Sequence, residues 1–104
     1  MELIDRIKKR IESGWCQNAL AKTSDGRRTD YFDPLACSWC LICACYIEQA
    51  PGNFHKDLEK FIEEKTGYSF ISSFNDSFRT TKEDVLKLLD DFKEKYSEAS
   101  LNQN

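Results

Sequence analysis

Four of the chain's five cysteines lie between positions 37 and 45, and this cluster restricts the possible folds more than any other feature. They are Cys37, Cys40, Cys43 and Cys45, and they fall in the longest apolar run of an otherwise polar sequence. Such a cluster either forms a metal or redox centre, or belongs to a buried helix that uses cysteine as a small hydrophobic residue. Most functional conclusions depend on this choice, and we favour the buried helix.

The geometry of one continuous helix argues against metal binding by the cluster. Cys-x-x-Cys metal sites usually occupy a turn that wraps around the ion, whereas the residues between these cysteines include no glycine. At about 100° per residue, the four sulfur atoms would spread over roughly 200° and could not meet at one ion. A zinc site that uses Cys37, Cys40 and an outside ligand such as Cys16 or His55 is the alternative. We predict no metal and no other cofactor, slow reaction of the buried thiols, and Cys16 as the most reactive thiol.

A cysteine nucleophile is the second chemical interpretation. Cys40 precedes His55 and then Asn75 or Asp76, which is the order found in papain-like hydrolases, but order without spacing or fold is weak support. A cysteine in the middle of a buried helix also lacks the helix N-terminus or cationic neighbour that lowers a thiol pKa. The sequence therefore argues against an enzyme without excluding one.

Length and charge indicate one small domain over residues 1–104, of which the polar end, residues 97–104, is expected to fray. A net charge of −3 argues against a nucleic-acid partner, and the apolar run 35–47 is too short to span a membrane. The charged N-terminal segment lacks the apolar stretch of a signal peptide. An odd number of cysteines without an export signal predicts reduced thiols and a cytoplasmic location.

Hydrophobic spacing predicts a mainly α fold. A first helix covers residues 2–13, with Gly14 as a left-handed C-terminal cap. A third helix covers about residues 54–66, and a fourth opens with a capping box of Thr80 and Glu83. Each of these helices has one apolar stripe, which predicts that each lies on the surface and buries one face.

The second predicted helix covers about residues 33–49 and contains the cysteine cluster. Asp33 is its expected N-cap and Pro34 its first helical residue. This helix is apolar nearly all round, so it is expected to be buried. The predicted fold is therefore about four helices around a central helix rich in cysteine and aromatic residues.

A small β-hairpin is predicted between the first two helices. Asp25-Gly26 supplies the backbone conformation of a tight turn, and residues 19–21 and 29–32 are the candidate strands. The segment 68–78 has no long period, which indicates a packed loop or a single turn.

Asn75 and Asp76 are the polar pair of greatest interest, because they lie among aromatic and apolar residues of the segment 68–78. One interpretation is an Asx turn that binds loop backbone before the fourth helix. The other is the polar centre of an aromatic-lined cleft, in which the two residues also accept indole N–H groups. The candidate site then consists of Trp15, Gln17, Trp39, Cys40, Asn75 and Asp76.

Short motifs along most of the chain carry a family resemblance. They are Gly14-Trp15 with Gln17, Ala19 to Ala21 before Asp25-Gly26, Asp33 with Ala36, Trp39-Cys40, Asn75-Asp76, and the helix opening from Thr80 to Leu86. On these motifs the chain resembles a small bacterial and phage family catalogued as domain of unknown function 6197. The resemblance implies no activity, because none is established for the family. The family tends to have glycine at the position of Cys43, which implies that only Cys40 of the cluster belongs to the shared pattern.

Two functions remain after these exclusions. The favoured one is a non-catalytic module that binds a protein partner or a second copy of itself, because no convergent catalytic set is evident and the segment 68–78 is rich in aromatics. Those aromatics are Tyr68, Phe70, Phe74 and Phe78. The alternative is a small enzyme or ligand-binding domain with its site at Asn75, Asp76, Trp39 and Cys40. A flat apolar surface would favour the first, and a concave pocket with a polar centre the second.

Overall fold

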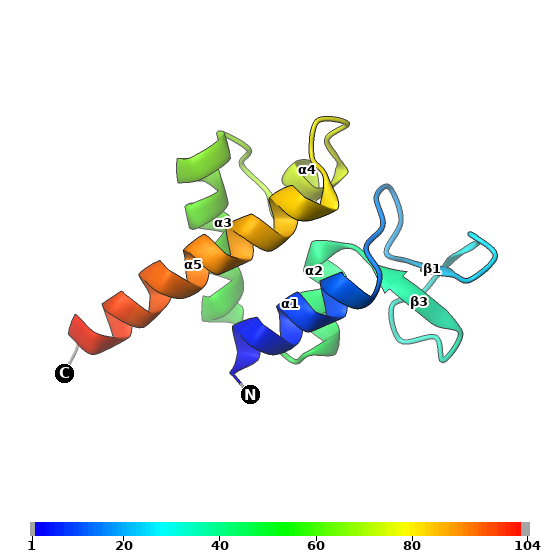
Figure 1. Cartoon of the computed structure of the whole chain (residues 1–104), viewed down its shortest axis with the longest axis horizontal. Helices are drawn as coiled ribbons and strands as arrows, with labels where there is room; N and C mark the ends of the chain where they lie inside the picture. Colours follow the sequence, from blue (N-terminus) through cyan, green and yellow to red (C-terminus); the bar gives the residue numbers. More distant parts are fainter. Residues whose placement is uncertain (1, 103–104) are drawn as a thin grey trace.

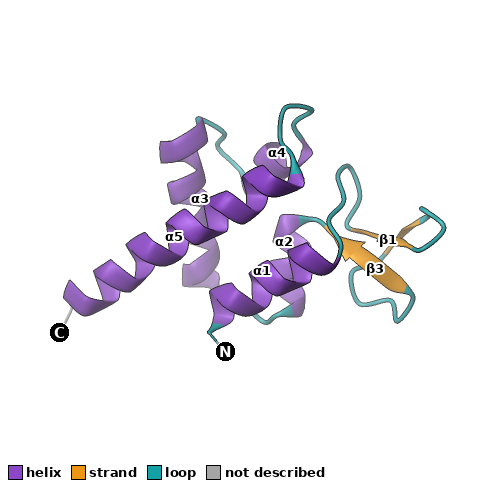
Figure 2. Cartoon of the chain, viewed as in Figure 1, coloured by secondary structure: helices purple, strands orange, loops and turns teal. Residues whose placement is uncertain are grey.

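The chain forms five helices and a three-stranded sheet within residues 2–102, the part that this computed structural model describes. Side chains are described for residues 2–96. In chain order the elements are α1 (Leu3–Ser13), β1 (Ala21–Thr23), β2 (Arg28–Thr29), β3 (Ala36–Trp39), α2 (Leu41–Ile47), α3 (Gly52–Thr66), α4 (Ile71–Asp76) and α5 (Lys82–Asn102). The sheet lies at one end of the helical body (Figure 2). The predicted mainly α class is therefore confirmed, although the sheet is larger than a hairpin.

The helical body is held together by apolar stripes of the predicted kind. α1 and α5 lie side by side and run in opposite directions (Figure 1). α1 buries Ile4, Ile7 and Ile11 on one face. The stripes of α3 and α5 add Phe54, Leu58, Phe61, Ile62, Val85, Leu88, Leu89 and Phe92. These side chains form one continuous core, which positions the shorter elements at the sheet end.

The cysteine-rich segment differs most from its prediction. In place of one helix over 33–49, the chain forms a turn, the strand β3 and the shorter helix α2. Asp33 caps no helix, because its carboxylate accepts a hydrogen bond from the Leu35 N–H at 2.9 Å and closes an Asx turn. Residues 36–39 then pair with β1, so their backbone groups bond to another strand. Periodicity missed this because a short apolar run suits a buried strand as well as a buried helix.

The position of β3 changes the expected environment of the thiols. Within β3, Cys37 near the start of the strand is exposed, whereas Trp39 at its end is buried. Cys40 occupies the N-cap position of α2, and only Cys43 and Cys45 lie within the helix. The prediction of four buried thiols on one helix is wrong.

The predicted hairpin turn is confirmed, but its strands cover other residues than predicted. β1 and β2 pair antiparallel around a turn in which Gly26 has a φ of 83°, as the Asp-Gly signal indicated. The strands cover 21–23 and 28–29, not 19–21 and 29–32. The sheet order is β2-β1-β3, with both pairs antiparallel. The third strand had no prediction because its partner is distant in the sequence.

Gly14 ends α1 by a different mechanism from the predicted left-handed cap. Its φ of 179° is extended backbone, which any residue can adopt. A Cβ atom at this position would lie 2.0 Å from the carbonyl oxygen of Cys37 and 2.9 Å from Cα of Ser38. Glycine is needed here because the chain leaving α1 passes directly against the backbone of β3.

In the C-terminal half, the positions at which helices begin also differ from the predicted ones. The segment 68–78 contains the short helix α4, where a loop or a single turn was predicted. The capping box of α5 lies one residue later than predicted. The Thr81 N–H donates to the Asp84 carboxylate at 2.9 Å, and the Asp84 N–H donates to Thr81 Oγ1 at 3.2 Å. Because α5 begins at Lys82, the N-cap is Thr81 and the third helical residue is Asp84, in place of the predicted Thr80 and Glu83.

α5 is described as far as Asn102. The fraying predicted for residues 97–104 stays a prediction, because the side chains of these residues lie outside the described part of the chain. Within the described residues, no helix combines the length and the apolar character needed to cross a membrane.

Candidate functional site

Asn75 is completely buried near the C-terminal end of α4. Its side-chain oxygen accepts hydrogen bonds from the Trp15 indole N–H at 2.7 Å and from the Leu41 backbone N–H at 3.0 Å. Its amide nitrogen donates to the carbonyl oxygen of Cys16 at 3.1 Å and to Asp76 Oδ1 at 2.9 Å. An asparagine side chain has two donor hydrogens and two acceptor lone pairs. This side chain therefore has no polar capacity left for a ligand.

Gln17 also binds the segment at the C-terminal end of α4, through backbone carbonyl oxygens. Its Nε2 lies within hydrogen-bond distance of three backbone carbonyl oxygens, those of Ser77 at 2.7 Å, Asn75 at 2.9 Å and Thr80 at 3.2 Å. Carbonyls at the end of a helix lack partners within the helix, and Gln17 supplies one. The irregular segment after α1 is thereby fixed against the end of α4.

The structure brings four of the six predicted site residues into one hydrogen-bonded network: Trp15, Gln17, Asn75 and Asp76. Trp39 and Cys40 adjoin this network without a side-chain hydrogen bond to it. The Trp39 indole N–H donates to the Tyr31 carbonyl oxygen at 3.1 Å, and the Arg10 guanidinium lies 4.7 Å from the centre of its ring. The indole of Trp15, but not that of Trp39, has found the predicted acceptor.

The solvent-facing side of this region is a shallow depression of about 470 Å³. Its lining comes from the segment before β1, from β2, from the start of α2 and from α4: Asn18, Ala19, Leu20, Arg28, Cys40, Ile42, Ser72 and Asp76. Asp76 joins the depression to the network, since its Oδ1 accepts both the Asn75 amide and the Asn18 backbone N–H at 2.9 Å. Any external molecule that reaches this region meets the depression and not Asn75.

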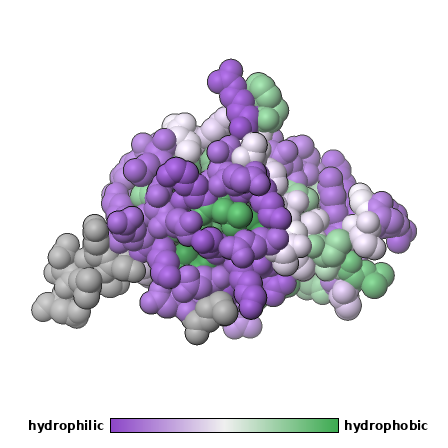
Figure 3. Space-filling model, viewed as in Figure 1, coloured by the Kyte–Doolittle hydropathy of each residue, from purple (hydrophilic) through white to green (hydrophobic). Residues whose placement is uncertain are grey.

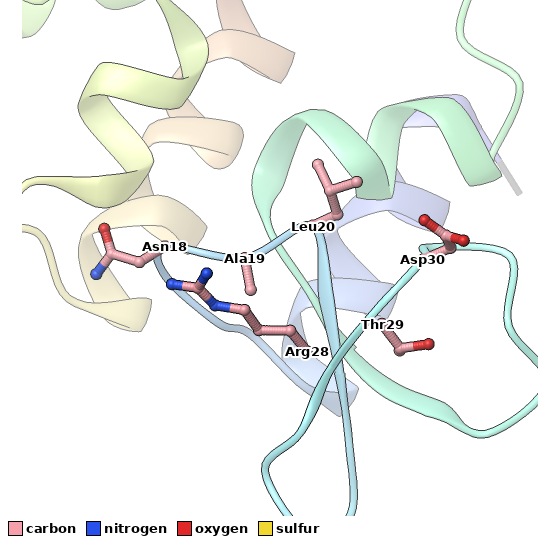
Figure 4. Close-up of a pocket in the computed structure, with 6 residues that line it drawn as sticks. All are labelled: Asn18, Ala19, Leu20, Arg28, Thr29 and Asp30. Carbon is pink, nitrogen blue, oxygen red and sulfur yellow. The ribbon is translucent and has the colours of Figure 1, made fainter.

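A second depression of about 410 Å³ continues the first along the hairpin (Figure 4). It shares Asn18, Ala19, Leu20 and Arg28 with the first and adds Thr29 and Asp30. The Arg28 side chain extends along the depression toward Asn18, whereas Asp30 projects on the opposite side (Figure 4). Each depression is lined by the Arg28 guanidinium, by one carboxylate (Asp76 or Asp30) and by apolar side chains.

The described thiols differ in their environments. Burial raises the pKa of Cys16 and raises that of Cys45 to about 12. The neighbouring Cys40 thiol raises the pKa of Cys43. The Cys43 thiol and the backbone N–H groups of Cys43 and Ile42 lower the pKa of Cys40, despite its burial. The expectation that Cys40 lacks neighbours that lower its pKa is therefore wrong, because Cys40 begins a helix and does not lie within one.

The other proposed metal and nucleophile partners lie elsewhere. The His55 ring is 5.0 Å from that of Tyr46, at the start of α3. Cys16 is buried, and its thiol donates to the Ala19 carbonyl oxygen at 3.7 Å. Across the described residues, no three His, Cys, Asp or Glu side chains form a group suited to a metal ion. The exposed thiol is that of Cys37, whereas Cys16, which was expected to be the most reactive thiol, is buried.

Sequence reasoning missed the residues that face solvent at this site. Arg28 and Ser72 are exposed polar residues in unremarked positions, and no local pattern marks them. Asparagine at position 18 is a weak sequence indication of a tight bend, because asparagine tolerates the positive φ of 60° that Asn18 adopts here. Their convergence depends on the pairing of β1 with β3, which the sequence did not predict.

These observations define a class: a small helical domain with a three-stranded sheet at one end and a buried asparagine that joins α4 to the start of α2 and to the segment after α1. The chain belongs to the Family of unknown function (DUF6197), whose family model matches residues 1–95. This match confirms the resemblance carried by the short motifs. Neither the curated proteins nor the solved structures include a significant match to the chain.

Proposed function

We propose that the protein is a non-catalytic module that binds a partner protein through an apolar strip at its sheet end. The strip consists of Leu20, Tyr31, Phe32, Ile42 and Tyr46. Leu20, Phe32 and Tyr46 are 50%, 68% and 47% exposed, and the other two are half-buried. Apolar residues exposed singly are normal on a protein surface, whereas contiguous ones indicate an interaction site.

Contiguity of the strip is the observation that carries this proposal. Leu20 and Ile42 line the same depression, and Tyr46 follows Ile42 by one helical turn on α2. The Tyr46 ring lies 5.8 Å from that of Tyr31, which lies 5.3 Å from that of Phe32. Apolar surface also gathers at the sheet end in the space-filling view, at the lower right (Figure 3).

The segment 68–78 supports an interface less well than the sequence suggested. Phe74 is buried in the core, and Tyr68 is half-buried with its hydroxyl 2.7 Å from Ser77 Oγ. Phe70 and Phe78 expose their rings, and the Arg79 guanidinium lies 5.5 Å from the centre of the Phe78 ring. These four aromatics do not form one flat surface, so we place the interface at the strip.

The charge beside the strip indicates the chemistry of the partner. Arg28 lines the same depression as Leu20 and Ile42, and it forms no ion pair with any described side chain. The strip has five side chains, far fewer than the about 20–30 residues that each side of a standard interface contributes. The surface therefore suits a short segment of another protein that carries apolar side chains and a carboxylate.

A displayed library of random peptides, selected on the immobilised full chain, tests this proposal. Selected peptides should combine apolar and acidic residues, and calorimetry should give a Kd that Phe32→Ala and Arg28→Glu each raise by about tenfold or more. Phe78→Ala is the matched control, since this ring is 90% exposed outside the strip, and it should leave the Kd unchanged.

Two results would contradict the proposal. One is a set of peptides that bind the wild type and the Phe32→Ala variant equally well. The other is a concentration-dependent dimer in sedimentation velocity that Phe32→Ala abolishes, which would make a second copy of the chain the occupant of the strip.

A further inference from the structure

Cys40 and Cys43 form a pair whose thiols do not belong to the apolar strip, although Cys40 lines the same depression as Leu20 and Ile42. Cys40 is the N-cap of α2, with extended backbone at φ −73° and ψ 164°, and Cys43 lies in the first turn. Side chains at the N-cap and at the third helical residue face each other, as in a capping box. In keeping with this placement, the Cys43 thiol lowers the pKa of Cys40 and the Cys40 thiol raises the pKa of Cys43.

Access to the two thiols is unequal. Cys40 lines the depression and is 7% exposed, whereas Cys43 is 1% exposed and does not line it. A molecule in the depression can therefore approach the sulfur of Cys40, and that of Cys43 lies behind it. One accessible thiol backed by a second, enclosed thiol is the arrangement that thiol–disulfide exchange needs.

We propose that Cys40 and Cys43 are a redox-active dithiol that reduces a low-molecular-weight disulfide and closes a disulfide between themselves. The Cys40 thiolate attacks one sulfur of the external disulfide, whose S–S bond breaks, and the first thiolate leaves with the proton that Cys40 lost. Cys43 then loses its proton and attacks Cys40 Sγ, and the second external thiolate leaves with that proton. The external disulfide gains two electrons and two protons, and the two cysteines lose them.

The surroundings of the pair favour each half of this exchange. A lowered pKa gives Cys40 a larger thiolate fraction near neutral pH, and the thiolate is the attacking species. The raised pKa of Cys43 keeps it a thiol while Cys40 carries the charge. Arg28 and Asp76 both line this depression, but Asp76 Oδ1 already accepts hydrogen bonds from Asn75 and Asn18. Arg28 forms no ion pair with any described side chain, so it favours a disulfide that carries carboxylates, such as that of glutathione.

The remaining cysteines provide matched controls. Cys37 is exposed, but the extended strand β3 separates it from Cys40 by about 3.3 Å per residue, beyond the reach of a disulfide. Cys45 lies on α2 and is completely buried. Neither is expected to pair with Cys40.

The test is equilibration of the reduced full chain with glutathione and glutathione disulfide at increasing oxidised fraction, followed by acid quenching and alkylation under denaturing conditions. The number of free thiols should fall from the five of the sequence to three, and peptide mapping should join Cys40 to Cys43. Cys37→Ser should still lose two thiols. Cys43→Ser should stop at the first step, with glutathione bound to Cys40.

The wild-type measurement decides the proposal even if Cys43→Ser fails to fold, which its circular dichroism melting curve would reveal. The proposal is overturned if all five thiols persist, if glutathione attaches to Cys37 alone, or if the disulfide joins any other pair. The role of Arg28 has its own readout. Arg28→Glu should slow oxidation by glutathione disulfide several-fold and should not slow oxidation by the cationic disulfide cystamine.

Discussion

Trp15 and Asn75 are 60 residues apart in the chain and are joined by a hydrogen bond of 2.7 Å. The same oxygen of Asn75 also accepts the Leu41 N–H at the start of α2, so one buried side chain connects three separate parts of the fold. Buried networks of this kind stabilise a fold when every member is satisfied, and they are costly when one member is removed.

Removal of the Asn75 amide should therefore cost more than the loss of a single helix cap. Asn75→Ala leaves the Trp15 and Leu41 N–H groups and the Cys16 carbonyl without their partner, and each buried unpaired group costs about 1–3 kcal/mol. We expect a loss of about 3 kcal/mol or more in urea unfolding. Ser73→Ala, on the exposed side of α4, should change stability by less than about 0.5 kcal/mol. An Asn75→Ala variant as stable as the wild type would show that the network serves something other than folding.

Gly14 and Gly52 give a second matched pair. Gly14→Ala places a Cβ 2.0 Å from a backbone oxygen of β3, so either the end of α1 or the strand must move, at about 3 kcal/mol or more. Gly52→Ala, at the first residue of α3, meets no atom within 4 Å and should stabilise the protein by about 0.4–1 kcal/mol through the unfolded chain. Thermal unfolding of both variants checks this, and equal melting temperatures would contradict the close contact between α1 and β3.

The helical body could be predicted from the sequence because its signals are local. The spacing of Ile4, Ile7 and Ile11 identifies one buried face without knowledge of what covers it. The acceptor for Trp15 could also be predicted, because a buried indole N–H needs a partner and few polar side chains lie among apolar ones. The first prediction depends only on residues near each other in the chain, and the second depends on the small number of polar side chains that could accept the indole N–H.

The sheet and the depression could not be predicted for the opposite reason. Ala36 to Trp39 have an apolar pattern that a helix would also accept, and only their pairing with Ala21 to Thr23 selects the strand. That pairing also places Cys40 at the start of a helix and Arg28 near it. The candidate site follows from one long-range contact, which local periodicity does not contain.

Native thiol labelling should follow this revised placement. With iodoacetamide and without denaturant, Cys37 should react first because it is exposed. In the Cys37→Ser variant, Cys40 should be the next to react, and Cys16, Cys43 and Cys45 should require denaturant because burial or the neighbouring thiol raises their pKa. Mass mapping of the alkylated peptides gives the order. Labelling of Cys16 ahead of Cys37 would contradict the described packing around Cys16.

Burial of Cys45 predicts a loss of stability at high pH. Its pKa is about 12 in the folded chain against an ordinary value of 9.0, so between these values the folded state binds more protons than the unfolded state. The contribution of Cys45 is therefore fully present below pH 9.0 and declines as the pH rises toward about 12. Lys8 and Lys93, whose pKa values are raised by their hydrogen bonds to Asp90 and Asp5, add to the decline at the upper end.

Urea unfolding at a series of pH values between about 8 and 11 separates the contribution of Cys45 from those of the lysines and of Cys16 and Cys43, whose pKa values are also raised. Cys45→Ala removes the titrating thiol, so its free energy of unfolding should fall less steeply with pH than that of the wild type, although its stability at neutral pH should be lower because of the small cavity. Cys37→Ala is the control, because this thiol is exposed, and it should keep the wild-type slope. Equal slopes for the wild type and Cys45→Ala would mean that Cys45 ionises as readily in the folded chain as in the unfolded one. In that case α2 would not enclose Cys45, and the burial assigned to this face of the helix would be wrong.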